Sequence, residues 1–322
     1  MRNLEAGPPA SPRRYADAPE LADAVARLAG ASLLVIGDAT LDRYICGRLT
    51  NGAASPAVPL LAVEREVALP GGSANLVRHL TALGASVAFV SLVGDDQAGS
   101  DLTGLIGGQP RVEPWLLVEG GRATTVRTTY IAGDRQVLRA DQEDAGPIQT
   151  KLAERLLRIA RDAMAGTAAT VLFDHGKGVL GGDLPAQLIA AAQQARRKVI
   201  AVSSEADWER YAGADLLVLG SAAAEPARVR EEHGFGAVAV LRGGAGIAAI
   251  DGAGAFDCPA AASARPEGAI EDAMLATIAA GLAVGLELRL AIRLASVAAD
   301  IVASRPGAAT VAADSDLLRV LA

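Results

Sequence analysis

Short apolar runs that alternate with helical stretches are the feature of this sequence that most constrains its fold. Each run is apolar almost throughout and closes on polar residues or glycine, as expected of a strand buried on both faces. The runs are "SLLVIGD", "SVAFVSLVGDD", "ATVLFDHG", "KVIAVSSE", "DLLVLGS" and "AVAVLRGG". Stretches with helical periodicity, such as "QTKLAERLLRIARDAMAG", separate most of them. This alternation predicts an α/β fold: a doubly wound, mostly parallel sheet with helices on both faces.

Two segments break this alternation and predict a small β lid. Residues 43–66 and 112–140 lack helical periodicity and are rich in β-formers and turn residues, so we expect antiparallel ribbons that project from the main sheet. Their long edges and apolar residues, such as Leu60, favour a homodimer or hetero-oligomer that forms through the lid. We expect residues 1–18, which are polar and rich in proline, to be a flexible tail, and residues 19–322 to form a single domain.

The composition argues against several classes of function. The 322 residues include 30 basic and 37 acidic side chains, and the net charge of −7 argues against nucleic acid or an anionic membrane as the main partner. The most apolar run, residues 273–286, is short and predicts a buried helix rather than a membrane span. Cys46 and Cys258 have no spacing typical of a metal site or a disulfide framework. A cytoplasmic protein without a dedicated metal site is the simplest expectation.

Polar residues at the ends of the predicted strands indicate where a ligand would bind. In parallel sheets, ligands bind beyond the carboxyl ends of the strands, and these ends carry Asp38, Asp95 and Asp174. A second candidate is "PEGAIEDAMLATIAAGL", where small residues lead into a long apolar helix. A helix amino terminus binds phosphate through its unpaired N–H groups, but Glu271 would repel an anion there. Asp272, which follows, also suits a residue that caps the helix or complements its dipole.

Three longer motifs resemble a known family. "GDATLDRYICGR", "PGGSANLVRHLTALGASVAFVSLVGDDQAGSDL" and "LFDHGKGVL" are similar to motifs of the ribokinase (PfkB) family of carbohydrate kinases, and the resemblance runs from about residue 30 to 315. Within the family, the motifs are most similar to the heptose-7-phosphate kinases of the ADP-heptose pathway. The resemblance implies a ribokinase-like sheet with a β lid that often mediates dimerisation. It also implies transfer of the γ-phosphoryl group of ATP, with Mg²⁺, to a sugar hydroxyl.

The resemblance implies a sugar side and a nucleotide side for the site. It implies that Asp38 and Asp42 hold sugar hydroxyls and that Gly71, Gly72 and Asn75 let the backbone approach the sugar ring. Arg127 and Arg139 would contact a phosphate on the sugar, and Asp174 and Lys177 would lie near the reacting phosphate. On the nucleotide side it implies Arg242, Gly246, Gly268 and Ala269, with Asp272 as the base that takes the hydroxyl proton. Simpler interpretations stay open. Asp38 and Asp174 would then cap the turns after buried strands, and Arg127 and Arg139 would be solvated strand charges.

Several positions depart from the family pattern, mostly on the nucleotide side. Ser204 stands where the family has the lysine of an Asp-Pro-Lys-Gly segment, and Ala269, Ile270 and Glu271 replace the Gly-Ala-Gly before the base. The lid segment "NGAASPAVP" has neither the arginine nor the glutamate of the heptose kinases. Phosphate groups are bound by fixed cationic donors and backbone amides, so these changes predict weak binding of ATP and make a phosphorylated heptose a poorer fit.

Two classes of function therefore stay open. The first is an ATP-dependent kinase for a sugar or sugar phosphate, with Asp272 as base, a degraded nucleotide site and reduced or lost activity. The second is a pseudokinase, which needs no cofactor and acts as a ligand-binding, regulatory or structural subunit. A Rossmann-type oxidoreductase is disfavoured, because the glycines of "GGAGIAAIDGAG" precede no suitable helix.

Overall fold

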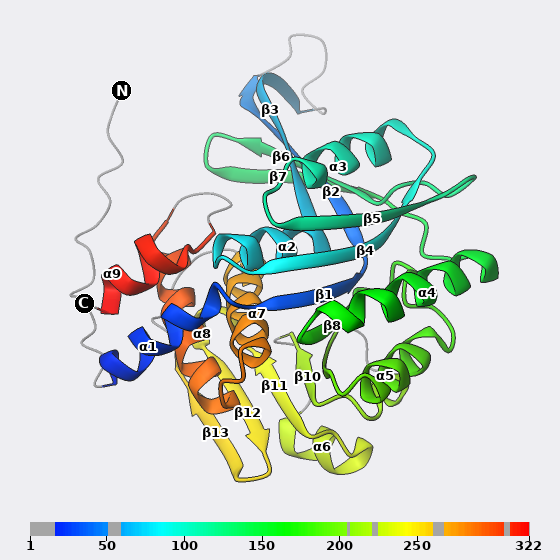
Figure 1. Cartoon of the computed structure of the whole chain (residues 1–322). Coiled ribbons are helices and arrows are strands. Elements are labelled where there is room, and N and C mark those ends of the chain that lie inside the picture. The colour runs from blue at the N-terminus through cyan, green and yellow to red at the C-terminus, as the bar shows by residue number, and fades with distance from the viewer. Residues whose placement is uncertain are drawn as a thin grey trace.

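A nine-stranded sheet forms the centre of the fold, in the order β13-β12-β11-β10-β9-β8-β1-β4-β5 (Figure 1). The computed structural model describes residues 17–50, 59–204, 207–220, 225–259, 267–305 and 310–321. The parallel strands are β1 (Ser32–Gly37), β4 (Ser86–Gly94), β5 (Val112–Glu119), β8 (Ala169–Asp174), β9 (Lys198–Ser203), β10 (Leu216–Leu219) and β11 (Ala237–Leu241). The antiparallel strands β12 (Ile247–Asp251) and β13 (Gly254–Cys258) close one edge. The predicted α/β fold with a mostly parallel sheet is confirmed.

Helices cover both faces of the sheet, because alternate side chains of the parallel strands point to opposite sides. In β1, Leu33 and Val35 pack into one core, and Leu34 and Ile36 pack into the other. The first core includes α1 (Ala18–Leu28), α2 (Ser73–Ala82), α3 (Gln97–Gly107), α7 (Glu267–Ala283), α8 (Leu288–Ala303) and α9 (Leu318–Leu321). The second core includes α4 (Thr150–Gly166), α5 (Leu184–Gln194) and α6 (Pro226–His233). The molecule thus has three layers, with helices on each side of the sheet (Figure 1).

A four-stranded lid projects from the carboxyl end of β1, at the top of Figure 1. Its strands are β2 (Ala39–Thr50), β3 (Leu60–Gly72), β6 (Val126–Ala132) and β7 (Arg135–Gln142), in the order β3-β2-β6-β7. β2 pairs with β3 in the antiparallel sense and with β6 in the parallel sense. The expected β lid therefore exists. Residues 51–58, which include most of the "NGAASPAVP" segment, lie outside the described residues.

The second predicted ribbon was placed wrongly over its first third. Residues 112–119 form β5, which pairs in parallel with β4 at the edge of the main sheet, so only β6 and β7 of this predicted ribbon belong to the lid. The physical reason is that an edge strand of a main sheet buries only part of its side chains. In β5, Leu117 is buried whereas Trp115 and Val118 are exposed. This half-buried pattern is the one expected of a projecting ribbon, so the sequence does not distinguish the two.

The apolar run of residues 273–286 forms a buried helix, as predicted. It lies mostly in α7, where Ala273, Met274 and Ile278 are buried between the sheet and α8. Within the described ranges, no helix is long and apolar enough to cross a membrane. α7 is also the helix that carries Asp272, so the packing of this helix fixes the position of that carboxyl group.

The carboxyl end of β1 passes very close to β8. A Cβ atom on Gly37 would lie 2.0 Å from the backbone oxygen of Phe173, a distance that real structures do not show. The next residue, Asp38, donates its backbone N–H to the same Phe173 oxygen at 3.1 Å. Glycine at position 37 is therefore needed for the two strands to end together, and this junction is where the lid begins.

We expect Gly37→Ala to lower the free energy of unfolding by about 2 kcal/mol or more, because the added methyl group would force β1 and β8 apart. Gly104→Ala is the matched control. Gly104 is exposed on α3, and a Cβ there meets no atom within 4 Å. Alanine is the better helix former, so the control should raise stability by about 0.5–1 kcal/mol. Urea unfolding followed by circular dichroism measures both; equal effects of the two substitutions would contradict the close approach at Gly37.

Candidate active site

Asp272 and Asn75 meet where α7 packs beside α2 (Figure 1). The Nδ2 atom of Asn75 donates a hydrogen bond to Oδ2 of Asp272 at 2.6 Å, although the two residues are 197 positions apart. The Nη1 atom of Arg78 in turn donates to Oδ1 of Asn75 at 2.7 Å. Two residues that the sequence assigned to the sugar and to the base are thus in direct contact, and both lie near the carboxyl end of β1.

The carboxyl group of Asp272 has a strongly perturbed pKa. The side chain is half-buried, and protein atoms surround the carboxylate, so burial raises the pKa from 3.8 to about 7. The negative charges of Glu271 and Asp42 add to this effect, whereas the hydrogen bond from Asn75 and the charge of Arg127 oppose it. A carboxylate with a pKa near 7 is suited to accept a proton at neutral pH.

Asp42 and Arg127 face the site from the lid. They lie opposite each other in the register of β2 and β6. Oδ1 of Asp42 accepts a hydrogen bond from Oγ1 of Thr40 at 3.0 Å. Burial raises the pKa of Asp42, and the charges of Arg127 and Arg139 counteract this effect. Arg139 itself is exposed and makes a two-pronged ion pair with Asp141, whereas Nε of Arg127 lies 3.9 Å from Asp141.

Gly71 and Gly72 leave room on β3 for the side chains and backbone of the paired strand β2 and of Asp38. A Cβ atom on Gly71 would lie 2.2 Å from Oγ1 of Thr40 and 2.5 Å from Oδ1 of Asp42. Gly72 has φ +57°, a left-handed conformation that favours glycine, and α2 begins at the next residue. These glycines therefore shape the wall that carries Asp42. Their contact with a sugar ring stays a prediction.

Asp38 is buried and holds the loop that follows β8. Its carboxylate accepts backbone hydrogen bonds from His175 at 2.8 Å, Lys177 at 3.0 Å and Val179 at 3.1 Å. Burial raises the pKa of Asp38 to about 6, although these hydrogen bonds favour its charged form. The contacts support the simpler interpretation, in which Asp38 caps the turn after a buried strand; direct binding of a sugar hydroxyl by Asp38 stays a prediction.

Asp174 and Lys177 also form internal contacts. Oδ1 of Asp174 accepts a hydrogen bond from the backbone N–H of Gly176 at 2.8 Å, and its other oxygen accepts one from the hydroxyl of Tyr211. Nζ of Lys177 lies 2.5 Å from Oε2 of Glu143. Asp174 therefore stabilises the turn after β8, and a phosphate that bound Lys177 would compete with Glu143 for it.

Three residues at the site were not identified from the sequence: Tyr44, Arg78 and His175. Tyr44 follows Asp42 by two positions on β2, and burial raises the pKa of its hydroxyl, with further effects from Asp42 and Arg127. Arg78 lies one helical turn after Asn75. His175 is exposed and lies within range of the charges of Arg127 and Lys177. Spacings of two in a strand and three in a helix place side chains on one face, and this signal would have indicated Tyr44 and Arg78.

The nucleotide side offers a turn but few partners for phosphate. The backbone N–H of Arg242 donates to the oxygen of Gly246 at 2.8 Å, which closes the turn η2 (Gly243–Ala245), and Gly246 has φ +97°. The Arg242 guanidinium lies 3.2 Å from Asp257, and both side chains are exposed. Ser204 directly follows β9, and its backbone N–H donates to the backbone oxygen of Asp174 at 3.3 Å. Ser204 adds no charge that would balance a phosphate.

The start of α7 differs from the expected anion-binding turn. The helix begins at Glu267, so Gly268 and Ala269 lie in its first turn; their side chains are outside the described part of the chain. Only the first few N–H groups of a helix lack an intrahelical acceptor. The N–H groups next to Asp272 are therefore used within the helix. Ile270 is buried in the core, and the Glu271 carboxyl is half-buried beside Asp272.

The residues at the start of α7 fit a nucleoside triphosphate poorly. Glu271 and Asp272 are adjacent carboxyl groups in α7, and their negative charges would repel a phosphate group that approached them. No three His, Cys, Asp or Glu side chains converge as metal ligands in the described ranges. Mg²⁺ is commonly held by substrate phosphates and one or two carboxylates, so it would enter with the nucleotide rather than in a protein cage.

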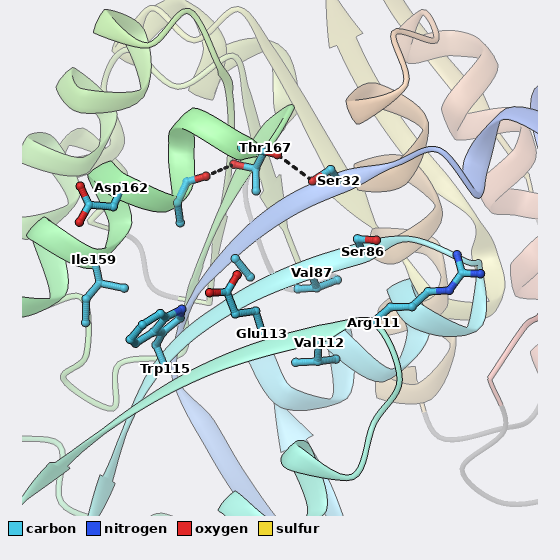
Figure 2. A pocket seen from close by; sticks show the side chains of 13 residues that line it. Ser32, Ser86, Val87, Arg111, Val112, Glu113, Trp115, Ile159, Asp162 and Thr167 are labelled. Atoms are coloured by element: carbon cyan, nitrogen blue, oxygen red, sulfur yellow. Dashed lines mark hydrogen bonds between the residues drawn. The ribbon is translucent and has the colours of Figure 1, made fainter.

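A separate pocket of about 540 Å³ opens at the other end of the sheet (Figure 2). Trp115 and Glu113 line it from β5, and Ile159 and Asp162 line it from α4. The pocket lies at the amino ends of β1, β4 and β5, whereas Asp38 and Asp174 lie at carboxyl ends. It is therefore not part of the candidate active site.

Comparison with known families identifies the class of protein. The sequence profile of the pfkB family carbohydrate kinases matches residues 31–315, and the chain belongs to this family. The bifunctional protein HldE of Acidiphilium cryptum (strain JF-5) is 56% identical over 198 residues, which cover 62% of this chain and 41% of that protein. HldE of Paramagnetospirillum magneticum (strain ATCC 700264 / AMB-1) is 36% identical over 312 residues, which cover 91% of this chain and 64% of that protein. The chain thus spans less than two thirds of the length of these relatives.

Solved structures share the fold at much lower sequence identity. The Arabidopsis thaliana ribokinase complexed with ribose and ATP has a TM-score of 0.70 and 18% identity, over 90% of this chain and 98% of that one. The microbiome-derived acarbose kinase Mak1 has a TM-score of 0.72 and 17% identity, over 90% of this chain and 99% of that one. The predicted ribokinase-like fold is confirmed by these similarities.

We expect Asp272→Asn to stabilise the protein at pH 8 and to have little effect near pH 4. The folded-state pKa of about 7 lies above the unfolded value of 3.8, so stability falls as pH rises between these values and the loss is complete above pH 7. This difference in pKa corresponds to about 4 kcal/mol in the free energy of unfolding. Partial solvent exposure of the side chain reduces the gain that we expect from the substitution to about 2 kcal/mol. The amide oxygen of the substituted side chain can still accept the Asn75 hydrogen bond.

Urea unfolding between pH 4 and 8.5 measures this gain. Asp162→Asn is the control, because Asp162 is an exposed carboxyl group on α4; it should change stability little at any pH. A gain for Asp272→Asn that does not depend on pH would show that the carboxyl group is not perturbed.

Proposed function

We propose that this chain binds a sugar or sugar phosphate between the lid and the carboxyl ends of β1 and β8, with Asp272 as the base of a heptose-7-phosphate kinase-like site. The hydrogen bond between Asn75 and Asp272, 2.6 Å long, carries the proposal, because it joins the sugar-side motif to the residue that would receive the hydroxyl proton. Similarity to the HldE proteins supports a sugar phosphate as the substrate class.

The residues around Asp272 have complementary roles in this proposal. Asp42 accepts hydrogen bonds from sugar hydroxyls, and Asp272, once ionised, accepts the proton of the reacting hydroxyl. Of the lid arginines, Arg139 is already paired with Asp141, whereas Nε of Arg127 has no hydrogen-bond partner within the described residues. Of these two residues Arg127 is held less tightly, because its Nε lies 3.9 Å from Asp141, and it is the one that we expect to bind a phosphate on the sugar.

Phosphoryl transfer by this site is slow or lost. Phosphoryl transfer depends mainly on positioning and on stabilisation of negative charge. Ser204 supplies no cation, and Glu271 adds a negative charge beside the base. Each weakened charge-assisted interaction costs about 1.5–3 kcal/mol, and about 1.4 kcal/mol corresponds to a factor of ten in rate. The two changes together therefore reduce turnover by a factor of about 100 to 10,000.

A second candidate function is a pseudokinase that binds a sugar ligand and acts as a regulatory or structural subunit. The half-buried Glu271 carboxyl next to Asp272 favours it, because this arrangement disfavours an incoming phosphate more than a neutral sugar. The two candidates share the sugar site and differ in whether nucleotide binds.

We expect ATP–Mg²⁺ to bind with a dissociation constant in the millimolar range or weaker, measured by calorimetry on the unmodified protein. Ser204→Lys with Glu271→Gln should strengthen binding about tenfold or more, because it adds a cation and removes a repulsive charge. Glu154→Gln, which removes an exposed charge on α4, is the control and should change nothing.

The outcome separates the two candidates. A sugar phosphate that raises the melting temperature, with slow sugar-dependent release of ADP, identifies a slow kinase; ligand binding without ADP release identifies the pseudokinase. Micromolar ATP affinity and ordinary turnover in the unmodified protein would contradict the weakened nucleotide side. If no sugar or sugar phosphate stabilises the protein at millimolar concentration, the sugar site itself is wrong.

We expect the protein to form a dimer through the lid. Leu60 and Val63 on β3 and Leu138 on β7 are more than half exposed, which is costly for a lone chain in water. Leu60→Glu with Val63→Glu should shift the sedimentation coefficient at micromolar concentration from that of a dimer to that of a monomer. Val320→Glu, an exposed apolar position on α9, is the control. A monomer for the unmodified protein would contradict the prediction.

A further inference from the structure

Arg78 is the first donor in a chain of two hydrogen bonds that ends on Asp272. It lies on α2, is half-buried, and donates from Nη1 to Oδ1 of Asn75 at 2.7 Å. Asn75 donates from Nδ2 to Oδ2 of Asp272 at 2.6 Å. α2 and α7 pack against each other, so both hydrogen bonds cross or adjoin a helix–helix contact rather than a mobile loop.

We infer that Arg78 is a positioning residue: it fixes the orientation of the Asn75 amide so that the NH₂ group of Asn75 donates to Asp272 and favours the ionised form of that carboxyl group. The inference rests on the proposed role of Asp272 as a base, but its test does not require turnover.

The chemistry of the three side chains allows one orientation of the amide. A guanidinium only donates hydrogen bonds and a carboxylate only accepts them, whereas an amide has one group of each kind. With Oδ1 toward Arg78 and Nδ2 toward Asp272, both contacts are favourable. In the flipped orientation, Nδ2 would face the donors of Arg78 and Oδ1 would face the carboxylate, and both contacts would be repulsive. Without Arg78, the flipped amide would accept a hydrogen bond from protonated Asp272 and would favour the neutral base.

Other charges also act on Asp272 and must be separated from this effect. Glu271 lies beside it on α7, Asp42 and Tyr44 face it from β2, and Arg127 faces it from β6. The Arg78 guanidinium is itself within range of the Asp272 charge. A direct effect of this charge on Asp272 would not depend on Asn75, whereas an effect of amide orientation requires Asn75. The two explanations therefore differ in a double-mutant cycle.

The test measures the pKa of Asp272 from the pH dependence of unfolding. The difference in stability between each protein and its Asp272→Asn derivative, followed from pH 4 to 9, gives this pKa without any ligand. We expect Arg78→Met to raise the pKa of Asp272 by about 1 and Arg78→Lys to raise it less, because lysine retains a charged donor. In an Asn75→Ala background, Arg78→Met should add a clearly smaller increase, because only the direct effect of the Arg78 charge is then lost.

Arg43→Met is the matched control, because Arg43 is a half-buried arginine of the lid that pairs with Asp101 instead. It should leave the pKa of Asp272 unchanged. If Arg78→Met does not fold, Arg78→Gln replaces it, because glutamine loses the charge and the reach to Asn75 and should act in the same direction.

Two results would overturn the inference: no change in the pKa of Asp272 on loss of Arg78, or an equal change whether or not Asn75 is present. The second result would mean that Arg78 acts on Asp272 only through its charge. A failure of the proposed function is distinguishable from both, because it would appear as an absence of sugar and nucleotide binding while the pKa measurements stay valid.

Discussion

Asp38 joins the four segments on which the candidate active site depends. Its backbone N–H bonds to the end of β8, and its backbone oxygen accepts the N–H of Ser73 at the start of α2, at 2.9 Å. Its carboxylate holds the backbone of the loop that follows β8. The lid begins at the next residue. A buried carboxylate is costly unless hydrogen bonds satisfy it, and here the three amides both satisfy Asp38 and fix the loop. The positions of Asn75 on α2 and of His175 in the loop follow from this one residue.

The site concentrates opposite charges in a small, partly buried space. Asp42, Glu271 and Asp272 carry negative charge, and Arg78 and Arg127 carry positive charge. The raised pKa values of Asp42 and Asp272 mean that the folded protein bears a free-energy cost at neutral pH in order to keep these carboxyl groups together. Such a cost is typical of functional sites, where the arrangement that suits a ligand is not the most stable one. The carboxylate oxygens suit hydroxyl groups, and the Arg127 guanidinium suits an anionic substituent, whereas Arg78 is engaged by Asn75.

Membership of the pfkB family of carbohydrate kinases explains the fold of this chain. What the chain does with this fold depends on the residues at the site. Structures with less than a fifth of their residues in common with this chain share its fold, because the fold requires only that strands be apolar on both faces and that helices cover them. Phosphoryl transfer is more demanding, since it depends on particular donors at particular positions. Thr40 donates a hydrogen bond to Asp42, and Asn75 donates one to Asp272, whereas Ser204 brings no cation and Glu271 adds a negative charge beside Asp272.

The sequence alone determined the layered architecture, the existence of a lid and the burial of the helix that carries Asp272, because these features follow from local hydrophobic periodicity. It did not predict the antiparallel pair β12 and β13 or the place of β5, because short and half-buried strands have the same local pattern in a ribbon and at a sheet edge. It placed Asn75 and Asp272 at one site only through the family resemblance, not through local pattern. Their hydrogen bond, the part that Arg78 plays in it and the use of the Asp38 carboxylate on backbone amides were decided by tertiary structure. The physical reason is that each of these contacts joins segments far apart in the chain, so their distance and orientation depend on how whole helices and strands pack.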